Sequence, residues 1–542
     1  MKNNLLFALA LLLLISCRSR KKYNEKLTKT HTVEDLQADV DFLFDNLDKN
    51  FPRLYGYISK KELNEKVEAF KSDLQPMTSA EFYHELIPLI SEIRQGHLFV
   101  RRPFKIWDKE VRKKYRKAKS NFNDLDFALI EDSVYIEEVY SKKDSTIIKS
   151  KLLAIDSTPT HAILRKWEKK LASDGFNTTF QKPVISDRII AFYGYDMGRK
   201  DSIMLKLKKA DSIFYQKLKY EFKKEKSEAK IKDTASTDMI TTKKEKDSIV
   251  PVKKLTRAEK KLKKKKRKEK FRDELKRGYS RRKKTDTREF RFVGKDSNIA
   301  YLKIRSFSGG NRWSKKFYEE KFHLLDSLNI QHLVLDLQDN TGGSLNEVGN
   351  LYSYLAEDDF QFIKPMEAKK RLILTKSLWS GKPSFVGHLL RGIATPFTFT
   401  ADLIRSKRKK DVVYVRHKWS KIREPKLNAF DGKIYVLING LSFSASSVIS
   451  SNLHGSARAT FIGEETGGAY NGTVAGLKMS KFLPNTNIAI PFWMMHLETP
   501  YKDNPNGYGI KPDIEVKQTL EDFYNDENTA LERALLEIES KN

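Results

Sequence analysis

The sequence is poor in cysteine, short of acidic residues, and has no long apolar run after its first residues. Its 542 residues include a single Cys, at position 17, which excludes an intramolecular disulfide framework and a cysteine-cluster metal site. Lys and Arg number 103 against 71 Asp and Glu, a formal charge of +32. Such a surplus suggests an anionic partner, either nucleic acid or a membrane surface. The only long apolar stretch is Leu5–Ile15, which is too short to span a bilayer.

Residues 1–17 have the pattern of an export segment. One Lys precedes the apolar stretch, and a small residue, Ser16, precedes Cys17. This arrangement resembles a bacterial lipobox, in which the cysteine is lipidated and becomes the new N-terminus. An ordinary secretory signal with an incidental Cys17 is the alternative. We expect a lipid-anchored protein of the bacterial cell envelope, on the periplasmic face of the outer membrane.

The rest of the chain divides by composition into five segments. A helical pattern with apolar residues at a period of 3.6 is followed by strand-like segments, a basic stretch and an α/β pattern. The predicted units are a helical unit over 23–96, a β-rich module over 97–215, a basic mobile insertion over 216–285, an α/β core over 289–520 and a C-terminal helix over 521–542.

The core alternates short apolar strands with helices. We predict strands over Ile299–Ile304, His332–Leu337 and Lys433–Ile438, and helices over Ser314–Leu328 and Ala445–Leu453. Alternation of this kind is typical of a mostly parallel sheet in an α/β fold.

The basic surplus is concentrated in Lys253–Lys284. This stretch holds 19 Lys or Arg and 4 Asp or Glu, a net charge of 19 − 4 = +15. It cannot bury itself, so a solvated helix or a disordered arm is expected. Its only aromatic residues are Phe271 and Tyr279, which offer little base stacking, and export also disfavours nucleic acid. Anionic headgroups are the better partner, and a plain solvated tether is the alternative.

A second basic insertion, over 361–425, interrupts the α/β pattern. It carries an apolar group around Trp379, Phe385, Leu389 and Leu390. Packing or a cover over a substrate cleft is favoured for this group over contact with a membrane.

Two junctions between a strand and a helix carry residues suited to catalysis. In Val334–Gly343 the paired glycines let backbone N–H groups approach a ligand, as an oxyanion hole requires, although a tight turn would use them equally well. In Asn439–Ser447 a serine-rich turn opens a helix. A serine there can be a nucleophile or a simple N-cap.

Together with their flanks, these junctions resemble the C-terminal processing (tail-specific) serine peptidases, and more closely their tricorn-core-like branch. The matching pieces, in the family's order, are KNFPRLYGY (Lys49–Tyr57), EIRQGHLFV (Glu92–Val100), VLDLQDNTGG (Val334–Gly343), SFSASSVISS (Ser442–Ser451), FIGEETGG (Phe461–Gly468) and NGYGIKPDIEV (Asn506–Val516). The resemblance implies a crotonase/ClpP-like peptidase core. It also places the 97–215 module where relatives carry a PDZ-like domain.

The resemblance assigns roles to individual residues. It implies Ser444 as the nucleophile, with oxyanion donors from Ala445 and from Gly342 or Gly343. Many relatives activate the serine with a lysine, but the matching position here is Ala469. The tricorn-like branch uses a histidine, which implies His97 as the general base.

Other assignments stay open. His97 could instead only cap or pack the end of the third helix, and His496 is the reserve base, while His454 is too far round its helix. The family's downstream acid falls on Asn506, which could orient an imidazole but cannot stabilise its charge. Nearby acids that could replace it are Glu465, Glu498 and Asp503.

Two functions follow from these expectations. The first is an envelope serine endopeptidase that acts on extended polypeptides through Ser-His acyl-enzyme chemistry and needs no cofactor or metal. The second is a catalytically impaired peptide-binding lipoprotein of the same fold, motivated by Ala469 and Asn506.

Overall fold

The computed structural model describes residues 21–140, 145–222, 256–309, 312–381, 385–503 and 505–540. The predicted export segment with Cys17 lies outside these ranges, as do Lys253 and Lys254 of the basic stretch. Within the described ranges, no helix has both the length and the apolarity that a membrane crossing requires.

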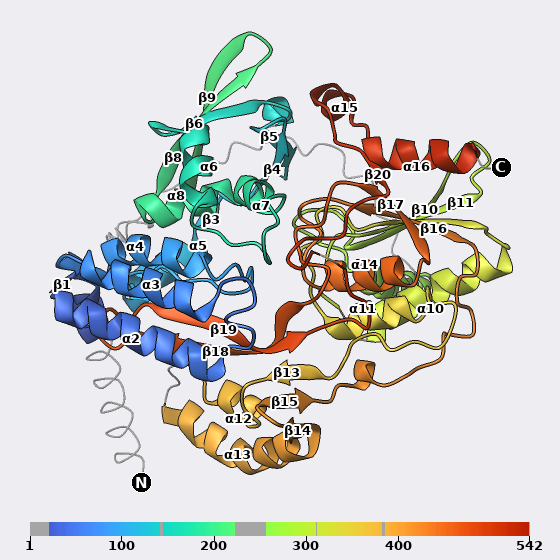
Figure 1. The fold of residues 1–542 in the computed structure, drawn as a ribbon. Helices are drawn as coiled ribbons and strands as arrows, with labels where there is room; N and C mark the ends of the chain where they lie inside the picture. The colour runs from blue at the N-terminus through green and yellow to red at the C-terminus, as the bar shows by residue number, and fades with distance from the viewer. Residues whose placement is uncertain are drawn as a thin grey trace, which may run out of the picture.

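The N-terminal unit is helical and packs on strands from the far end of the chain (Figure 1). Its elements are β1 (Thr30–His31), α2 (Val33–Asn50), α3 (Lys60–Ser72), β2 (Met77–Thr78) and α4 (Ser79–Ser91). Thr78 and Glu81 form a capping box at α4, as the sequence predicts. Asp39 of α2 accepts hydrogen bonds from the backbone and hydroxyl of Thr486, 447 residues further along the chain.

The following module is an antiparallel sheet with helices against it. Its strands follow the order β3-β9-β8-β6-β5-β4, with β7 beside β6. The elements are α5 (Lys109–Lys117), β3 (Lys119–Ser120), β4 (Leu125–Ile130), β5 (Ser133–Val139), the 3₁₀ turn η1 (Ser145–Ile147), β6 (Lys151–Ile155), β7 (Thr158–Pro159), α6 (Thr160–Glu168), α7 (Gln181–Asp187), α8 (Ile189–Met197), β8 (Ser202–Lys209) and β9 (Ser212–Glu221). The boundary expected at 215/216 falls inside β9, because Phe214 and Leu218 continue to face inward.

The described part of the basic segment is a helix, α9 (Arg257–Arg277). Thr256 and Glu259 cap its start, and Gly278 ends it in the left-handed conformation. None of its residues is buried, as expected for a solvated helix. Its last turn is nevertheless fixed to the core, because Lys276 Nζ lies 2.6 Å from Glu320 Oε2.

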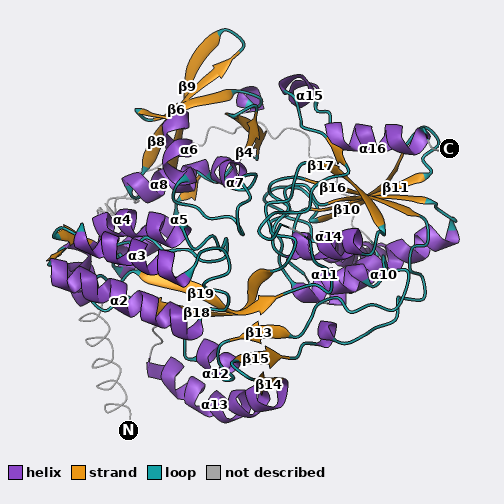
Figure 2. Ribbon diagram, viewed as in Figure 1, coloured by secondary structure: helices purple, strands orange, loops and turns teal. Residues whose placement is uncertain are grey.

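The core is a six-stranded sheet that is parallel except at one edge (Figure 2). The predicted alternation of strands and helices is confirmed. The elements are β10 (Arg288–Val293), β11 (Ile299–Ile304), α10 (Arg312–Ser327), β12 (His332–Asp336), α11 (Leu345–Tyr352), β16 (Lys433–Ile438), α14 (Ala445–Gly455), β17 (Ala459–Gly463) and β20 (Ile514–Glu515). The predicted C-terminal helix is two helices, α15 (Leu520–Asn525) and α16 (Thr529–Glu539), because Asp526 adopts a left-handed conformation between them.

A second sheet joins the core to the helical unit, in the order β14-β15-β13-β19-β18. Its elements and the attached helices are β13 (Met366–Ala368), α12 (Ile373–Leu378), α13 (Phe385–Arg405), β14 (Ser406–Lys409), β15 (Val412–Val415), the 3₁₀ turn η2 (Lys418–Ser420), β18 (Thr473–Phe482) and β19 (Ala489–Leu497). In Figure 1, β18 and β19 run beneath the helical unit, with α12 and α13 below them. Through this sheet the end of α4 lies close to the start of α14, since His97 Nε2 is 3.1 Å from Ser444 Oγ.

Candidate active site

Ser444 lies at the turn where β16 gives way to α14. Its backbone has φ 59° and ψ −115°, a conformation that residues with a side chain rarely adopt. The turn is fixed because Ser442 Oγ donates to Leu337 O and Ser446 Oγ donates to Asn340 O, both at 2.8 Å. This strained junction leaves the Ser444 hydroxyl partly exposed at the start of a helix, as a serine nucleophile requires.

His97 reaches Ser444 from the other end of the chain. Its Nε2 lies 3.1 Å from Ser444 Oγ, across 347 residues of sequence. The imidazole stacks on Phe443 with ring centroids 4.9 Å apart, and the indole of Trp493 meets it edge to face at 5.6 Å. Two aromatic contacts therefore fix the plane of the ring. The alternative, in which His97 only caps or packs the end of α4, does not account for the contact between His97 and Ser444.

A threonine and a buried aspartate lie behind His97. Thr473 Oγ1 is 3.1 Å from His97 Nδ1 and donates to Asp174 Oδ2 at 2.8 Å. An ionised carboxylate only accepts hydrogen bonds, so the single hydroxyl proton of Thr473 points to Asp174. Thr473 then accepts from Nδ1–H of His97, which leaves Nε2 free to accept the proton of Ser444. The order Ser444, His97, Thr473, Asp174 is a continuous hydrogen-bond chain.

The loop between α6 and α7 carries Asp174 into this position. Gly96 N–H donates to Asp174 Oδ1 at 2.9 Å, beside His97 itself. Phe176 N–H donates to Gly507 O at 2.7 Å. Gly175 has φ +80°, and a Cβ there would lie 2.3 Å from Gly507 O. The close backbone contact needs a glycine at this position.

Burial shifts both ionisable groups of the chain toward their neutral forms. It lowers the pKa of His97, an effect that the negative charge of Asp174 opposes. It raises the pKa of Asp174, which His97 and the hydrogen bonds from Thr473 and Gly96 oppose. A lowered pKa keeps His97 neutral near neutral pH, the form that can accept a proton.

The paired glycines lie directly against the serine turn. Gly342 has φ +96°, and a Cβ there would lie 2.8 Å from Cβ of Ser444 and 2.8 Å from N of Ala445. Its own N–H donates to Asn340 Oδ1 at 2.9 Å. Within the described ranges, no hydrogen bond occupies the N–H of Gly343 or of Ala445. These two N–H groups are therefore available to an oxyanion, whereas that of Gly342 is engaged by Asn340.

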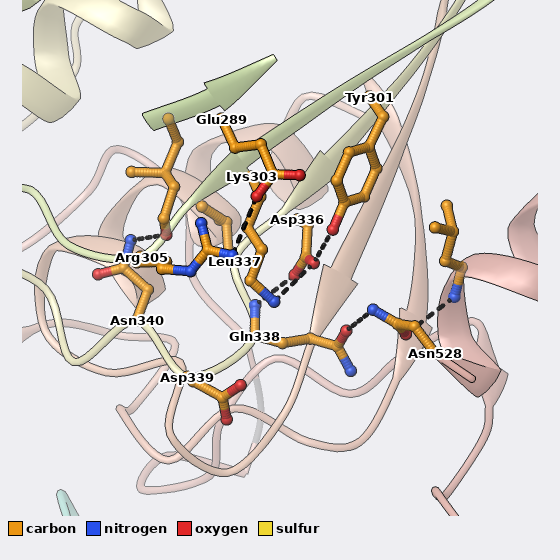
Figure 3. A network of polar contacts seen from close by, with 12 residues as sticks. Glu289, Tyr301, Lys303, Arg305, Asp336, Leu337, Gln338, Asp339, Asn340 and Asn528 are labelled. Carbon is orange, nitrogen blue, oxygen red and sulfur yellow. Dashed lines mark hydrogen bonds and ion pairs between the residues drawn. The ribbon is translucent and has the colours of Figure 1, made fainter. Parts of the chain in front are cut away.

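A buried polar network fixes the end of β12, just before this loop (Figure 3). Asp336 has no exposed surface, accepts from Tyr301 OH at 2.6 Å, and pairs with Lys303 Nζ at 3.1 Å. Asn340 Nδ2 donates to Ile304 O at 2.7 Å and so ties the loop to β11. The loop's path is thus set by side chains beneath it.

The other candidate residues lie in separate contacts. Asn506 Oδ1 accepts from Asn471 Nδ2 at 3.1 Å and does not orient His97. His454 Nδ1 lies 3.1 Å from Tyr470 OH. Glu465 accepts from Asn177 and Gly509, and Asp503 is joined through its backbone to Asn471.

One group could present three ligand atoms to a metal ion: Glu367, His496 and Glu498. The Arg53 guanidinium lies 2.7 Å from Glu367 and 3.1 Å from Glu498. Lys502 lies 2.8 Å from the other oxygen of Glu498. Because two basic side chains already neutralise the two carboxylates, this group is an ion-pair network rather than a metal cradle.

Comparison with known proteins agrees with this geometry. Residues 298–516 match the model of peptidase family S41. The core is therefore that of a serine-type peptidase with a mixed α/β fold. No curated protein matches the chain.

Several solved structures are also similar to this chain. Mature CPAF in complex with lactacystin is 14% identical with a TM-score of 0.54, covering 93% of this chain and 97% of that one. A second structure of mature CPAF is 14% identical with a TM-score of 0.52, covering 91% and 94%. The photosystem II D1 C-terminal processing protease is 12% identical with a TM-score of 0.40, covering 89% and 92%. At such identities the CPAF structures show the fold alone.

The sequence did not reveal Thr473 or Asp174. Asp174 stands in Ser173-Asp174-Gly175, a turn-forming tripeptide like many others, and Thr473 begins a strand. The usable hint in the sequence is that Asp174 precedes a glycine. Its near-complete burial distinguishes it from other turn residues, but burial is visible only in three dimensions.

Proposed function

We propose that this chain is an endopeptidase that hydrolyses extended polypeptides in the bacterial envelope. The observation that carries the proposal is the distance of 3.1 Å between Ser444 Oγ and His97 Nε2. The proposal also rests on a strained serine turn, a histidine held by aromatic rings, and two backbone N–H groups that donate no hydrogen bond within the described ranges. These are the parts that acyl-enzyme chemistry needs.

The reaction follows from the contacts. His97 Nε2 takes the hydroxyl proton while Ser444 Oγ bonds to the scissile carbonyl carbon, whose oxygen becomes the oxyanion. The N–H groups of Gly343 and Ala445 stabilise that charge. His97 then gives the proton to the leaving amine as the C–N bond breaks, which leaves an acyl ester on Ser444. Water, deprotonated by His97, hydrolyses the ester and restores the serine.

A fluorophosphonate probe tests this proposal. It should modify Ser444 in the wild-type chain, leave Ser444→Ala unlabelled, and react far more slowly with His97→Gln. His454→Gln is the matched control and should label like wild type, since His454 contacts Tyr470 instead. Absence of labelling in the folded wild-type chain would contradict the peptidase proposal.

The alternative is a peptide-binding protein with the same fold and no catalysis. This alternative is motivated by Ala469 and Asn506, which stand where relatives have a lysine and an acid. Asp174, connected to His97 through Thr473, has the carboxylate that Asn506 lacks, and this supports the peptidase proposal over the alternative. Retained peptide binding by Ser444→Ala, without cleavage by wild type, would support it.

The location is part of the proposal. We infer lipidation at Cys17 and placement on the periplasmic face of the outer membrane. The support is the lipobox-like sequence before this single cysteine. Cells fed labelled palmitate should incorporate the label into wild type and not into Cys17→Ser. Equal incorporation in both would contradict lipidation at this residue.

The basic stretch Lys253–Lys284 is proposed to contact anionic headgroups. Helix α9 supports this because its basic side chains from Arg257 to Arg272 are exposed. Replacing Lys263, Lys264, Lys265 and Lys266 by Gln should weaken binding to anionic vesicles at low salt without changing the fold. Unchanged binding would leave this stretch as a solvated tether.

A further inference from the structure

Helix α13 turns its apolar side outward. Eight large apolar side chains of this helix are exposed, and Phe397, with 75% of its surface accessible, is the most exposed of them. They are Val386, Leu389, Leu390, Ile393, Phe397, Phe399, Leu403 and Ile404. Leu389 and Leu390 are each 62% exposed, so packing does not describe them, while the expected cover over a substrate cleft stays a prediction. A group of eight exposed apolar side chains on one helix marks an interaction site.

The orientation of α13 is fixed by its polar side. Asp402 is buried and accepts hydrogen bonds from the N–H groups of Leu374 and Thr375, both at 2.9 Å, at the start of α12. Thr395 accepts from Trp379 Nε1 at 2.8 Å. Because these polar contacts hold the inner face, the apolar face has no place in the core.

A basic cavity of about 530 Å³ lies at the C-terminal end of α12. Its lining includes Lys49, Lys370, Lys376, Lys481, Trp379 and Ser380. No carboxylate lines it, and within the described ranges no carboxylate pairs with Lys370, Lys376 or Lys481. Burial and the neighbouring charges of Lys370 and Lys481 lower the pKa of Lys376. Lys49 already pairs with Asp45 at 2.6 Å, but the other three lysines, which have no carboxylate partner within the described ranges, are suited to an anion.

We propose that the exposed face of α13 and the lysine-lined cavity together dock this protein on an anionic phospholipid bilayer. The apolar face enters the boundary between headgroups and acyl chains, and the cavity receives the phosphate of one lipid. Trp379, at the cavity and 42% exposed, suits the same interface.

Charge complementarity favours a membrane over a second copy of this chain or a polypeptide. Of the charged residues of α13, Arg405 is exposed, Arg391 is half-buried and donates to Ser380 O, and Asp402 is buried. The hairpin that follows exposes Lys407–Lys410 against one acid, Asp411. An anionic bilayer matches an apolar stripe bordered by basic residues.

The start of the described chain lies on the same side of the molecule. In Figure 1, α2 and α13 both border the lower side, with α12 between α13 and the sheet above it. Lys376 Nζ of α12 lies 2.7 Å from Asn50 Oδ1 at the end of α2. Docking through α13 does not depend on the lipid proposed at Cys17.

Vesicle co-sedimentation of the full chain carrying Cys17→Ser tests the proposal without an attached lipid. Vesicles of phosphatidylcholine are compared with an equimolar mixture of phosphatidylcholine and phosphatidylglycerol. Replacing Leu390, Ile393 and Phe397 together by Gln should weaken binding to the mixed vesicles by about tenfold or more. The matched control replaces three exposed apolar residues elsewhere, Ile422, Leu427 and Leu536, and should bind as the parent does.

The cavity is tested separately by replacing Lys376 and Lys481 with Gln. Binding to mixed vesicles should fall by about fivefold per lysine, toward that on phosphatidylcholine alone. Fluorophosphonate labelling of Ser444, or unchanged urea unfolding, verifies that each variant folds. Unchanged vesicle binding in the α13 variant overturns the proposal. The proposal is also overturned if that variant loses self-association but still binds vesicles. It is overturned as well if the cavity binds inorganic phosphate and no phospholipid.

Discussion

The hydroxyl of Thr473 lies 2.8 Å from the carboxylate of Asp174 and connects it to His97, the proposed general base. Triads usually join the carboxylate to the imidazole directly. Here a neutral hydroxyl lies between them, 3.1 Å from Nδ1 of His97. The carboxylate charge is therefore farther from the imidazolium that forms during reaction, and its stabilising effect falls with that distance. Thr473 fixes the tautomer of His97, while Asp174 fixes the direction of the Thr473 hydroxyl.

Thr473→Val tests the bridge. Valine keeps the size of the side chain but cannot accept from His97 Nδ1, so the imidazole loses its tautomer preference. We expect the rate of Ser444 labelling by fluorophosphonate to fall by about 10- to 100-fold. Thr473→Ser keeps the hydroxyl and should recover most of the rate. Equal rates in Thr473→Val and wild type would mean that the hydroxyl has no part in orienting His97.

The pH dependence of labelling should report His97. Neutral His97 is the active form, so the rate rises with pH and levels off above the pKa of His97. Burial lowers that pKa, so the midpoint should lie below the ordinary histidine value of about 6.5.

Asp174→Asn separates charge from position in the same experiment. Asp174 raises the pKa of His97, so its removal should move the midpoint to still lower pH. The plateau should fall as well, by about 10²- to 10⁴-fold, because the imidazolium loses its counter-charge. A midpoint that moves to higher pH in Asp174→Asn would contradict the assigned direction.

The sequence predicted one half of the site and could not predict the other. Ser444 and Gly342 follow strands in local turns that a short motif describes, and His97 follows a helix whose cap is also local. Thr473 and Asp174 meet across 299 residues, where no spacing rule applies. The outward face of α13 escaped for a related reason. Its apolar pattern favours packing or a cover over a cleft, whereas the contacts of Asp402 with α12 and of Thr395 with Trp379 turn that face outward.

Gly342→Ala should disable the site through the backbone. The residue has φ +96°, and an added Cβ would lie 2.7 Å from Phe443 O. We expect loss of Ser444 labelling and a fall in the free energy of unfolding of about 1–3 kcal/mol, measured in urea. Gly392→Ala in α13 is the matched control, because nothing lies within 4 Å of its added Cβ. That control should keep labelling and lose no stability.

The buried ion pair between Arg288 and Glu347 joins β10 to α11, the helix that follows Gly342 and Gly343. Their side chains are 4% and 0% exposed, and Arg288 Nη1 lies 2.9 Å from Glu347 Oε1. Glu347→Gln should lower the free energy of unfolding by about 3–5 kcal/mol, because it leaves the Arg288 charge buried. The double variant Arg288→Met, Glu347→Gln should recover part of that loss. A double variant less stable than Glu347→Gln alone would show that the charge of Arg288 is not the cause.

Three histidines should make the fold sensitive to mild acid. Burial lowers the pKa of His84, His417 and His496 to about 4 in each case. Their unfolded-state pKa is about 6.5, so between these values the unfolded chain binds more protons than the folded one. The stability that depends on them is present above pH of about 6.5 and is lost as the pH falls toward about 4.

The urea midpoint at several pH values from about 7.5 to 5 measures this loss. By pH of about 5, each histidine should cost on the order of 1–2 kcal/mol of unfolding free energy. His496→Gln should flatten the pH dependence, since glutamine does not titrate, whatever its effect on stability at neutral pH. His161→Gln, at an exposed position, is the control and should follow wild type. If His496→Gln follows the wild-type slope as closely as the control does, His496 is not a source of the acid sensitivity.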